Sequence, residues 1–214
     1  IAEAVVAVTG PGARLVRYEG ADRFDVLPLL VATDGAIEAF GWERLLEAVG
    51  DDAERFGEAV LGSIFEVSLH HYKAWAETSI EVFMCHDDMV WTSGPFIHPD
   101  FYRTYIFPRY QALWAPLKAA GKRIIYCSDG TYDMFVDELA AAGADGFCFE
   151  PTNDLEMLVR KFGRTHVLMG GADCRTLSFG TPEDIERELR WVFALAFHVE
   201  FIGNLAGNRR GFGA

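Results

Sequence analysis

Residues 123–130 read RIIYCSDG, an apolar run that ends on a thiol, a hydroxyl, a carboxylate and a glycine. Ile124, Ile125 and Tyr126 are residue types that favour strands. Ser, Asp and Gly are typical of the point where a buried strand reaches the surface and a helix begins. The segment therefore predicts a strand followed by a polar turn, and it leaves open whether Asp129 caps the next helix or belongs to a functional site.

The same pattern occurs in three other places along the chain. Apolar runs end on acidic residues in EVFMCHDD (81–88), GFCFEP (146–151) and HVLMGGAD (166–173). Runs that are apolar throughout are typical of parallel strands buried on both faces. Because the carboxyl ends of parallel strands meet at one edge, the acids that follow these strands are expected to lie together.

The segments between these strands carry helix signals, namely proline in the first turn, a capping residue or a closing glycine. They are residues 98–121, 131–143, 153–163 and 181–197. Pro108 and Pro116 are expected to kink or divide the first of them. Asn153 with Glu156 predicts a capping box at the start of the third.

The rest of the chain is less regular. Residues 41–78 are expected to be mainly helical, 25–35 to hold a strand and its loop, and 201–207 to form one further strand. Alternating strands and helices with buried strands indicate either a (β/α)8 TIM barrel or an open doubly wound sheet. No GxGxxG or GxxxxGK motif follows any strand, which removes the usual nucleotide-binding signs of the open sheet.

Acids after four strands favour the α/β barrel, whose active sites lie at the carboxyl ends of its strands. We interpret residues 1–214 as a single barrel domain. A barrel usually needs about 250 residues, so the first strand or strands are expected to be missing from this chain.

Composition limits the partners. The net charge is −13, from 19 basic and 32 acidic residues, which disfavours nucleic acid and argues mildly against a polyanionic substrate. No stretch is long and apolar enough to suggest a membrane span. The four cysteines form no CxxC pair and no signal peptide precedes them, which favours a reducing cytoplasm over a disulfide framework.

The strand ends supply the candidate site residues. Strand alternation places Cys127 below Asp129 and Cys148 below Glu150, giving an acidic rim with thiols beneath it. Such a rim suits proton transfer or metal binding. We predict that Asp88, Asp129 and Glu150 are catalytic. The predicted substrate contacts are His86, Asp87, Ser128, Asp173 and Arg175.

The cysteines leave a choice of roles. Cys127 and Asp129 are the candidate ligands for a zinc ion, since zinc accepts thiolate and carboxylate ligands and catalytic sites keep an open position. Cys148 lies between two phenylalanines and is expected to be a small core residue.

The stretch DDMVWTSGPFIHPDFYRTYIFPRYQALWAPLKAAGKRIIYCSDG (87–130) resembles the uroporphyrinogen decarboxylase superfamily. Members of that superfamily carry an acidic strand end, then "GP.I.P..Y", "P.Y..L...K..G" and "HSDG" or "HxCG". GADGFCFEP (143–151) and LMGGADCRTLSFGTPEDIERELR (168–190) are similar to its next two units. The resemblance covers roughly residues 80–192 and implies a barrel enzyme.

The resemblance implies two reactions. Porphyrinogen decarboxylases remove acetate carboxyls from a tetrapyrrole without a cofactor. The methyltransferase branch moves methyl groups between corrinoid proteins and a thiol or pterin acceptor, with zinc held by a His-x-Cys pair and a later Cys. Here Cys127 stands at the His position and Asp129 at the Cys position, and no Cys occurs near 203–208.

We expect a methyltransferase-like member that takes a corrinoid as substrate, with a corrinoid protein as partner and zinc as cofactor. The acidic rim and the few arginines near it (Arg103, Arg109 and Arg175) favour this reading, because a substrate with many carboxylates needs cations. One alternative is a cofactor-free uroporphyrinogen decarboxylase acting on a tetrapyrrole. The other is a catalytically inactive barrel that binds a corrinoid protein, favoured by the loss of the expected His at position 127.

Overall fold

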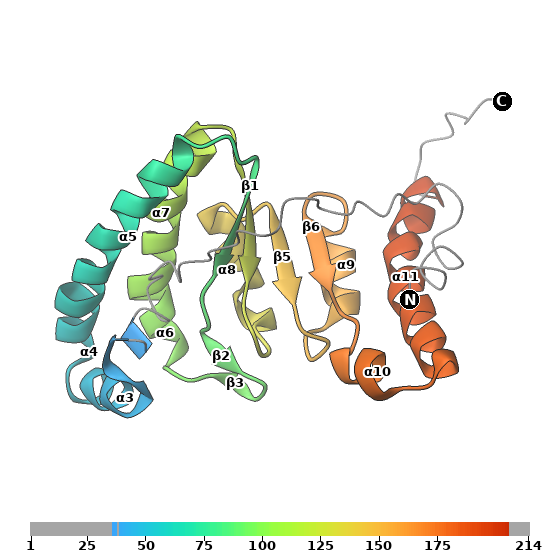
Figure 1. Ribbon diagram of the computed structural model, residues 1–214, viewed down its shortest axis with the longest axis horizontal. Helices are drawn as coiled ribbons and strands as arrows, with labels where there is room; N and C mark the ends of the chain where they lie inside the picture. Colours follow the sequence, from blue (N-terminus) through green and yellow to red (C-terminus); the bar gives the residue numbers. More distant parts are fainter. Residues whose placement is uncertain (1–35, 38, 206–214) are drawn as a thin grey trace.

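Four parallel strands joined by helices form the centre of the computed structural model (Figure 1). The structure describes residues 36–37 and 39–205, and side chains as far as residue 194. Its helices and strands are α3 (Trp42–Asp51), α4 (Ala53–Arg55), the π-helix η2 (Phe56–Val60), α5 (Leu61–Ala76), β1 (Val82–His86), β2 (Val90–Trp91), β3 (Gly94–Pro95), α6 (Pro99–Phe101), the π-helix η3 (Tyr102–Ile106), α7 (Phe107–Ala119), β4 (Arg123–Cys127), the 3-10 helix η4 (Asp133–Phe135), α8 (Val136–Ala142), β5 (Gly146–Phe149), α9 (Leu155–Phe162), β6 (Val167–Gly170), α10 (Cys174–Phe179) and α11 (Pro182–Leu205).

The main sheet has the strand order β1-β4-β5-β6, and each pair of neighbours is parallel. A helix lies in each connection: α7 between β1 and β4, α8 before β5 and α9 before β6. The four strands predicted from the acidic strand ends are therefore confirmed, as is the mainly helical character of 41–78. The strand expected within 25–35 lies outside the described residues.

The strand expected over 201–207 is wrong as far as residue 205, because α11 continues to Leu205. Residues 198–200 read HVE and contain neither the glycine nor the proline that would end a helix before this segment. An apolar run that follows a helix without a break therefore extends the helix.

The two faces of the sheet have different surroundings. Side chains such as Phe83, Tyr126 and Phe147 are buried on the face that packs against helices. Tyr110 and Trp114 of α7 stack with ring centroids 5.1 Å apart, and Tyr110 also packs on Tyr126. This aromatic layer attaches α7 to the sheet. Helix α5 packs beside α7 (Figure 1).

The opposite face is apolar yet partly open. Val82 and Met84 on β1, with Val167 and Met169 on β6, keep roughly half of their surface exposed. A parallel sheet normally has both faces covered. An α/β sheet of this kind, with helices on one face and, among the described residues, exposed apolar side chains on the other, is consistent with part of a barrel wall.

The helical segment from Pro99 to Ala119 shows how its prolines act. His98 caps it, since its Nδ1 accepts a hydrogen bond from the Asp100 N–H at 3.3 Å. The π-helical turn η3 ends two residues before Pro108, whose missing N–H removes one bond of the helical ladder. The predicted division at Pro108 is thus confirmed, whereas α7 runs on through Pro116 undivided.

The start of α9 differs from the predicted capping box. Its N-cap is Asp154, whose carboxylate accepts a hydrogen bond from the Met157 N–H at 2.9 Å. Asn153 is buried one residue earlier and binds other parts of the chain. Thr181 caps the start of α11, because its Oγ1 accepts a hydrogen bond from the Asp184 N–H at 3.2 Å.

Asp145 joins the sheet to α7 at the amino ends of the strands. Its carboxylate accepts hydrogen bonds from the Lys118 ammonium at 2.7 Å, the Ile124 N–H at 2.9 Å and the Arg123 guanidinium at 3.2 Å. Burial raises the pKa of Asp145, but the bonds from Lys118, Ile124 and Arg123 outweigh burial and hold that pKa below its usual value.

Across the described residues, no helix combines the length and the apolar character that crossing a membrane requires.

Candidate functional site

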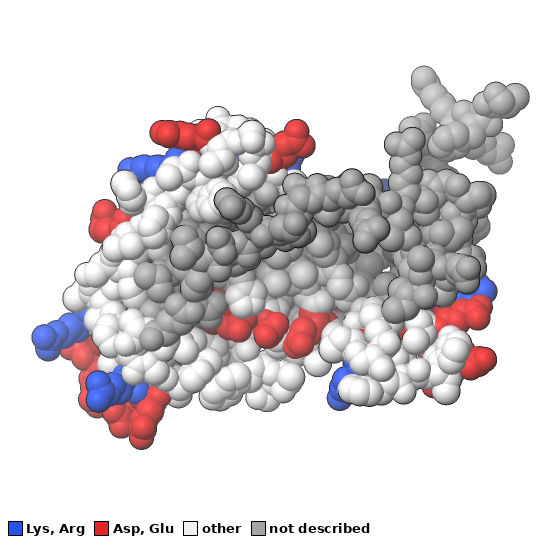
Figure 2. All heavy atoms as spheres, viewed as in Figure 1, with Lys and Arg blue, Asp and Glu red and all other residues white. Residues whose placement is uncertain are grey.

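The carboxyl ends of β1, β4 and β5 open on one pocket of about 470 Å³. Three carboxylates line it, those of Asp88, Asp129 and Glu150, together with two tryptophans, Trp42 and Trp91. Among the described residues, no Lys or Arg is part of this lining. In the space-filling view, acidic side chains gather below the ends of the central strands (Figure 2). The three residues predicted to be catalytic therefore share one pocket.

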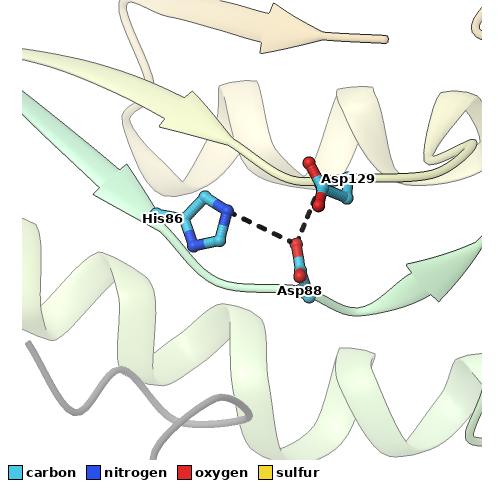
Figure 3. A group of neighbouring side chains, drawn as sticks. All are labelled: His86, Asp88 and Asp129. Atoms are coloured by element: carbon cyan, nitrogen blue, oxygen red, sulfur yellow. Dashed lines mark hydrogen bonds and ion pairs between the residues drawn. The ribbon is translucent and has the colours of Figure 1, made fainter. Parts of the chain in front are cut away.

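His86, Asp88 and Asp129 converge at the edge of this pocket. His86 is the last residue of β1, Asp88 lies in the loop after it, and Asp129 follows β4; both His86 and Asp129 approach Asp88 (Figure 3). The Asp129 N–H donates to Asp88 Oδ1 at 2.8 Å, and His86 Nε2 lies 3.6 Å from the same oxygen. The Ser128 hydroxyl lies 3.3 Å from Asp88 Oδ1.

These contacts test whether Asp129 caps the next helix. The helical turn that follows begins after Tyr132, and its N-terminus receives no side-chain cap. The N-terminus of α8 receives none either. Asp129 therefore does not cap a helix, and its carboxylate is an exposed part of the pocket lining.

The turn after Asp129 fits closely against the β2–β3 hairpin. Gly130 has φ of 77°, and a Cβ added there would lie 2.8 Å from the backbone oxygens of Val90 and Trp91. The Thr131 N–H also donates to the Trp91 carbonyl at 3.2 Å. A glycine is required because the backbone is left-handed and there is no room for a side chain.

Asn153 links the turn after β4 to the turn after β5. Its amide donates to the Gly130 carbonyl at 2.8 Å and the Glu150 carbonyl at 3.1 Å, and its oxygen accepts from the Tyr132 N–H at 2.9 Å. The Gly130 N–H in turn donates to Glu150 Oε2 at 2.8 Å. Asn153 thus positions two sides of the pocket without being part of its lining.

A row of histidine, cysteine and methionine side chains, which are types that can bind metals, crosses the sheet one layer below the carboxylates. The strand register pairs His86 with Cys127, Cys127 with Cys148, and Cys148 with Met169. Interaction with the Cys127 thiol lowers the pKa of Cys148 to about 7, whereas interaction with Cys148 and burial raise the pKa of Cys127. Cys148 is half-buried in this row, so the expectation that it is a core residue is wrong.

The remaining predicted contacts occupy different surroundings. Asp87 is fully buried, accepts a hydrogen bond from the Tyr110 hydroxyl, and receives the Tyr126 hydroxyl on its carbonyl at 2.6 Å. Asp87 therefore lies in the core, where it holds the end of β1 in place. Asp173 caps α10 and pairs with Arg175, whose guanidinium and N–H hold the pKa of Asp173 below its usual value.

Three site residues were not found from the sequence. Asn153 carries a visible signal, a polar residue before a helix, but that signal predicts a helix cap. Trp91 comes three residues after Asp88 at an acidic strand end, a position that can mark a pocket residue. Trp42 lies far away in the sequence and no local pattern points to it.

The family model for uroporphyrinogen decarboxylase (URO-D) matches residues 39–207. The chain belongs to this family. The family fold is a TIM barrel, with which the partial barrel wall described above agrees. Family membership indicates an enzyme in general terms and leaves the reaction open. None of the curated proteins compared with the chain matches it.

Proposed function

We propose that this URO-D family member is a methyltransferase-like enzyme that moves a methyl group to or from a corrinoid at the pocket of Asp88, Asp129 and Glu150. The observation that supports it best is the charge of the pocket lining. It has three carboxylates and, within the described part of the chain, no cation. A substrate that carries many carboxylates would be repelled there.

The arginines near this end of the sheet are engaged elsewhere. Arg175 pairs with Asp173 at 3.0 Å, and Arg103 pairs with Glu138 at 2.9 Å. Arg109 donates to the backbone carbonyl of Gly57 at 2.7 Å. Turning any of them to a porphyrinogen carboxylate would cost these bonds, which argues against decarboxylase activity on a tetrapyrrole.

The carboxylates suit the proton transfer that methyl transfer requires. A thiol acceptor must lose its proton as its sulfur takes the methyl group from the corrinoid, whose cobalt keeps the electron pair of the broken Co–C bond. A positioned carboxylate accepts that proton. Glu150 is held for this role by the Gly130 N–H on one oxygen, and Asp88 is held by the Asp129 N–H. The tryptophans at the rim, Trp42 and Trp91, offer flat apolar surface to a large ring system.

The test is a direct assay of the purified chain with methylcobalamin and a small thiol. Loss of the methylcobalamin absorbance and formation of the methyl thioether are expected with wild type. Glu150→Gln should lower the rate by about a hundredfold, the usual scale for a positioned acid or base. The matched control is Asp137→Asn, which removes an exposed carboxylate that pairs with Lys161 on the helical surface.

A parallel assay supplies uroporphyrinogen and follows carboxyl loss by chromatography. Decarboxylation that depends on Glu150, with no demethylation of the corrinoid, would replace the proposed reaction by the decarboxylase. Demethylation that is equally fast in Glu150→Gln and in wild type would remove this pocket from the reaction.

A further inference from the structure

The zinc site implied by the methyltransferase branch does not fit this chain. Position 127 is Cys where that branch has His, position 129 is Asp where it has Cys, and no Cys occurs near 203–208. A metal bound here would therefore need a different set of ligands.

We propose that His86, Asp88 and Asp129 form a site for a divalent transition-metal ion such as Zn²⁺. One ligand atom from each of the three lies within 4.8 Å of the others. The set combines an imidazole with two carboxylates on neighbouring strands, so it is held by the β1–β4 register, in which His86 is the partner of Cys127, two residues before Asp129 (Figure 3).

The distances require little movement. Zinc binds imidazole nitrogen and carboxylate oxygen at about 2.0–2.2 Å, so two ligand atoms of one ion lie at most about 4.4 Å apart. His86 Nε2 and Asp88 Oδ1 already meet this limit at 3.6 Å. The side chains of His86 and Asp129 are exposed, so rotation about their side-chain bonds can bring the remaining ligand atoms from within 4.8 Å of one another to within this limit. The Asp129 N–H and the Ser128 hydroxyl orient Asp88, as outer partners of metal ligands do.

The chemistry of the set selects the class of ion. An imidazole ligand favours zinc, iron or nickel over magnesium and calcium, which prefer oxygen alone. Two carboxylates balance the two positive charges, and Glu150 adds negative charge to the same pocket. Three protein ligands leave one position open towards the pocket, where a bound zinc ion would polarise a substrate or lower the pKa of a water molecule.

Metal binding can be tested without substrate, so its outcome is independent of the proposed methyl transfer. Metal-free protein is titrated with ZnCl₂ by calorimetry, and bound zinc is measured after gel filtration. We expect one equivalent of zinc for wild type. His86→Ala and Asp129→Asn should each weaken binding at least tenfold, with far-ultraviolet circular dichroism confirming that each variant is folded.

The matched control is His98→Ala. His98 forms a second exposed imidazole–carboxylate pair, with Nδ1 3.7 Å from Asp100 Oδ2, and it belongs to no group of three ligands within the described residues. Its substitution should leave zinc affinity unchanged. Wild-type binding no tighter than that of His86→Ala would overturn the proposal, as would equal losses in His98→Ala and His86→Ala.

Cobalt distinguishes this set from the thiol ligand predicted at Cys127. Co²⁺ bound by nitrogen and oxygen shows no thiolate-to-metal charge-transfer band, and Cys127→Ala should keep its full equivalent of metal. A charge-transfer band that disappears in Cys127→Ala, together with loss of metal, would overturn the set of His86, Asp88 and Asp129.

Discussion

Replacing Asn153 tests the hydrogen bonds that hold the two turns of the pocket together. Its side chain is 5% exposed and makes three hydrogen bonds, to Gly130, Glu150 and Tyr132. Each such bond contributes about 1 kcal/mol net, so Asn153→Ala should lower the free energy of unfolding by about 3 kcal/mol. For a chain of this length that corresponds to a fall in Tm of about 6–12 °C.

The neighbouring residue supplies the control. Asp154 makes one capping bond, to the Met157 N–H, so Asp154→Ala should cost about 1 kcal/mol and lower Tm by about 2–4 °C. Urea denaturation followed by circular dichroism gives both free energies from the same transition. The difference between the two variants measures what Asn153 does beyond starting a helix.

Two results would refute this reasoning. The first is an Asn153→Ala variant that loses no more stability than Asp154→Ala. The second is a double-mutant cycle in which Asn153 and Glu156 show a coupling of about 1 kcal/mol, which would restore the capping box and remove the link between the turns.

Three other substitutions probe the site and its support. Asp129→Asn should change the free energy of unfolding by less than about 0.5 kcal/mol, because its side chain is exposed, and should lower activity about a hundredfold; a destabilised variant with full activity would exclude Asp129 from catalysis. Gly130→Ala should cost about 1–3 kcal/mol more than Gly121→Ala, since both glycines have φ near 77° but only Gly130 faces a clash; equal urea midpoints would contradict this. The pKa of Asp145 is lowered in the folded state, so its contribution of about 1 kcal/mol to stability is present above pH 4 and is lost as the pH falls through the folded pKa. The difference in urea midpoint between wild type and Asp145→Asn should therefore shrink on acidification. A difference that grows on acidification would contradict a lowered pKa.

The strands and their acidic ends were predictable because each is written in consecutive residues. An apolar run with β-branched and aromatic residues that ends on an acid gave β1, β4, β5 and β6 in parallel order. Parallel strands bring their carboxyl ends to one edge, and this rule alone predicts that Asp88 lies near Asp129, as the structure shows.

What could not be predicted depends on partners far away in the sequence. Asn153 and Asp154 are equally good capping residues, and the choice between them follows from the Tyr132 N–H and the Gly130 carbonyl that Asn153 meets. Trp42 lines the pocket from α3, which lies outside the strand-and-acid pattern that predicts the other pocket residues.

The bond from the Asp129 N–H to Asp88 joins residues 41 positions apart. Closing a loop of that length costs about 3 kcal/mol of chain entropy. The pocket therefore forms only once the chain has returned from β1 and β4 has paired with it. A ligand bound by both Asp88 and Asp129 would stabilise the pairing of β1 with β4. Its binding energy should then appear as slower amide hydrogen exchange along residues 82–86, and this protection would be detectable whichever reaction the pocket performs.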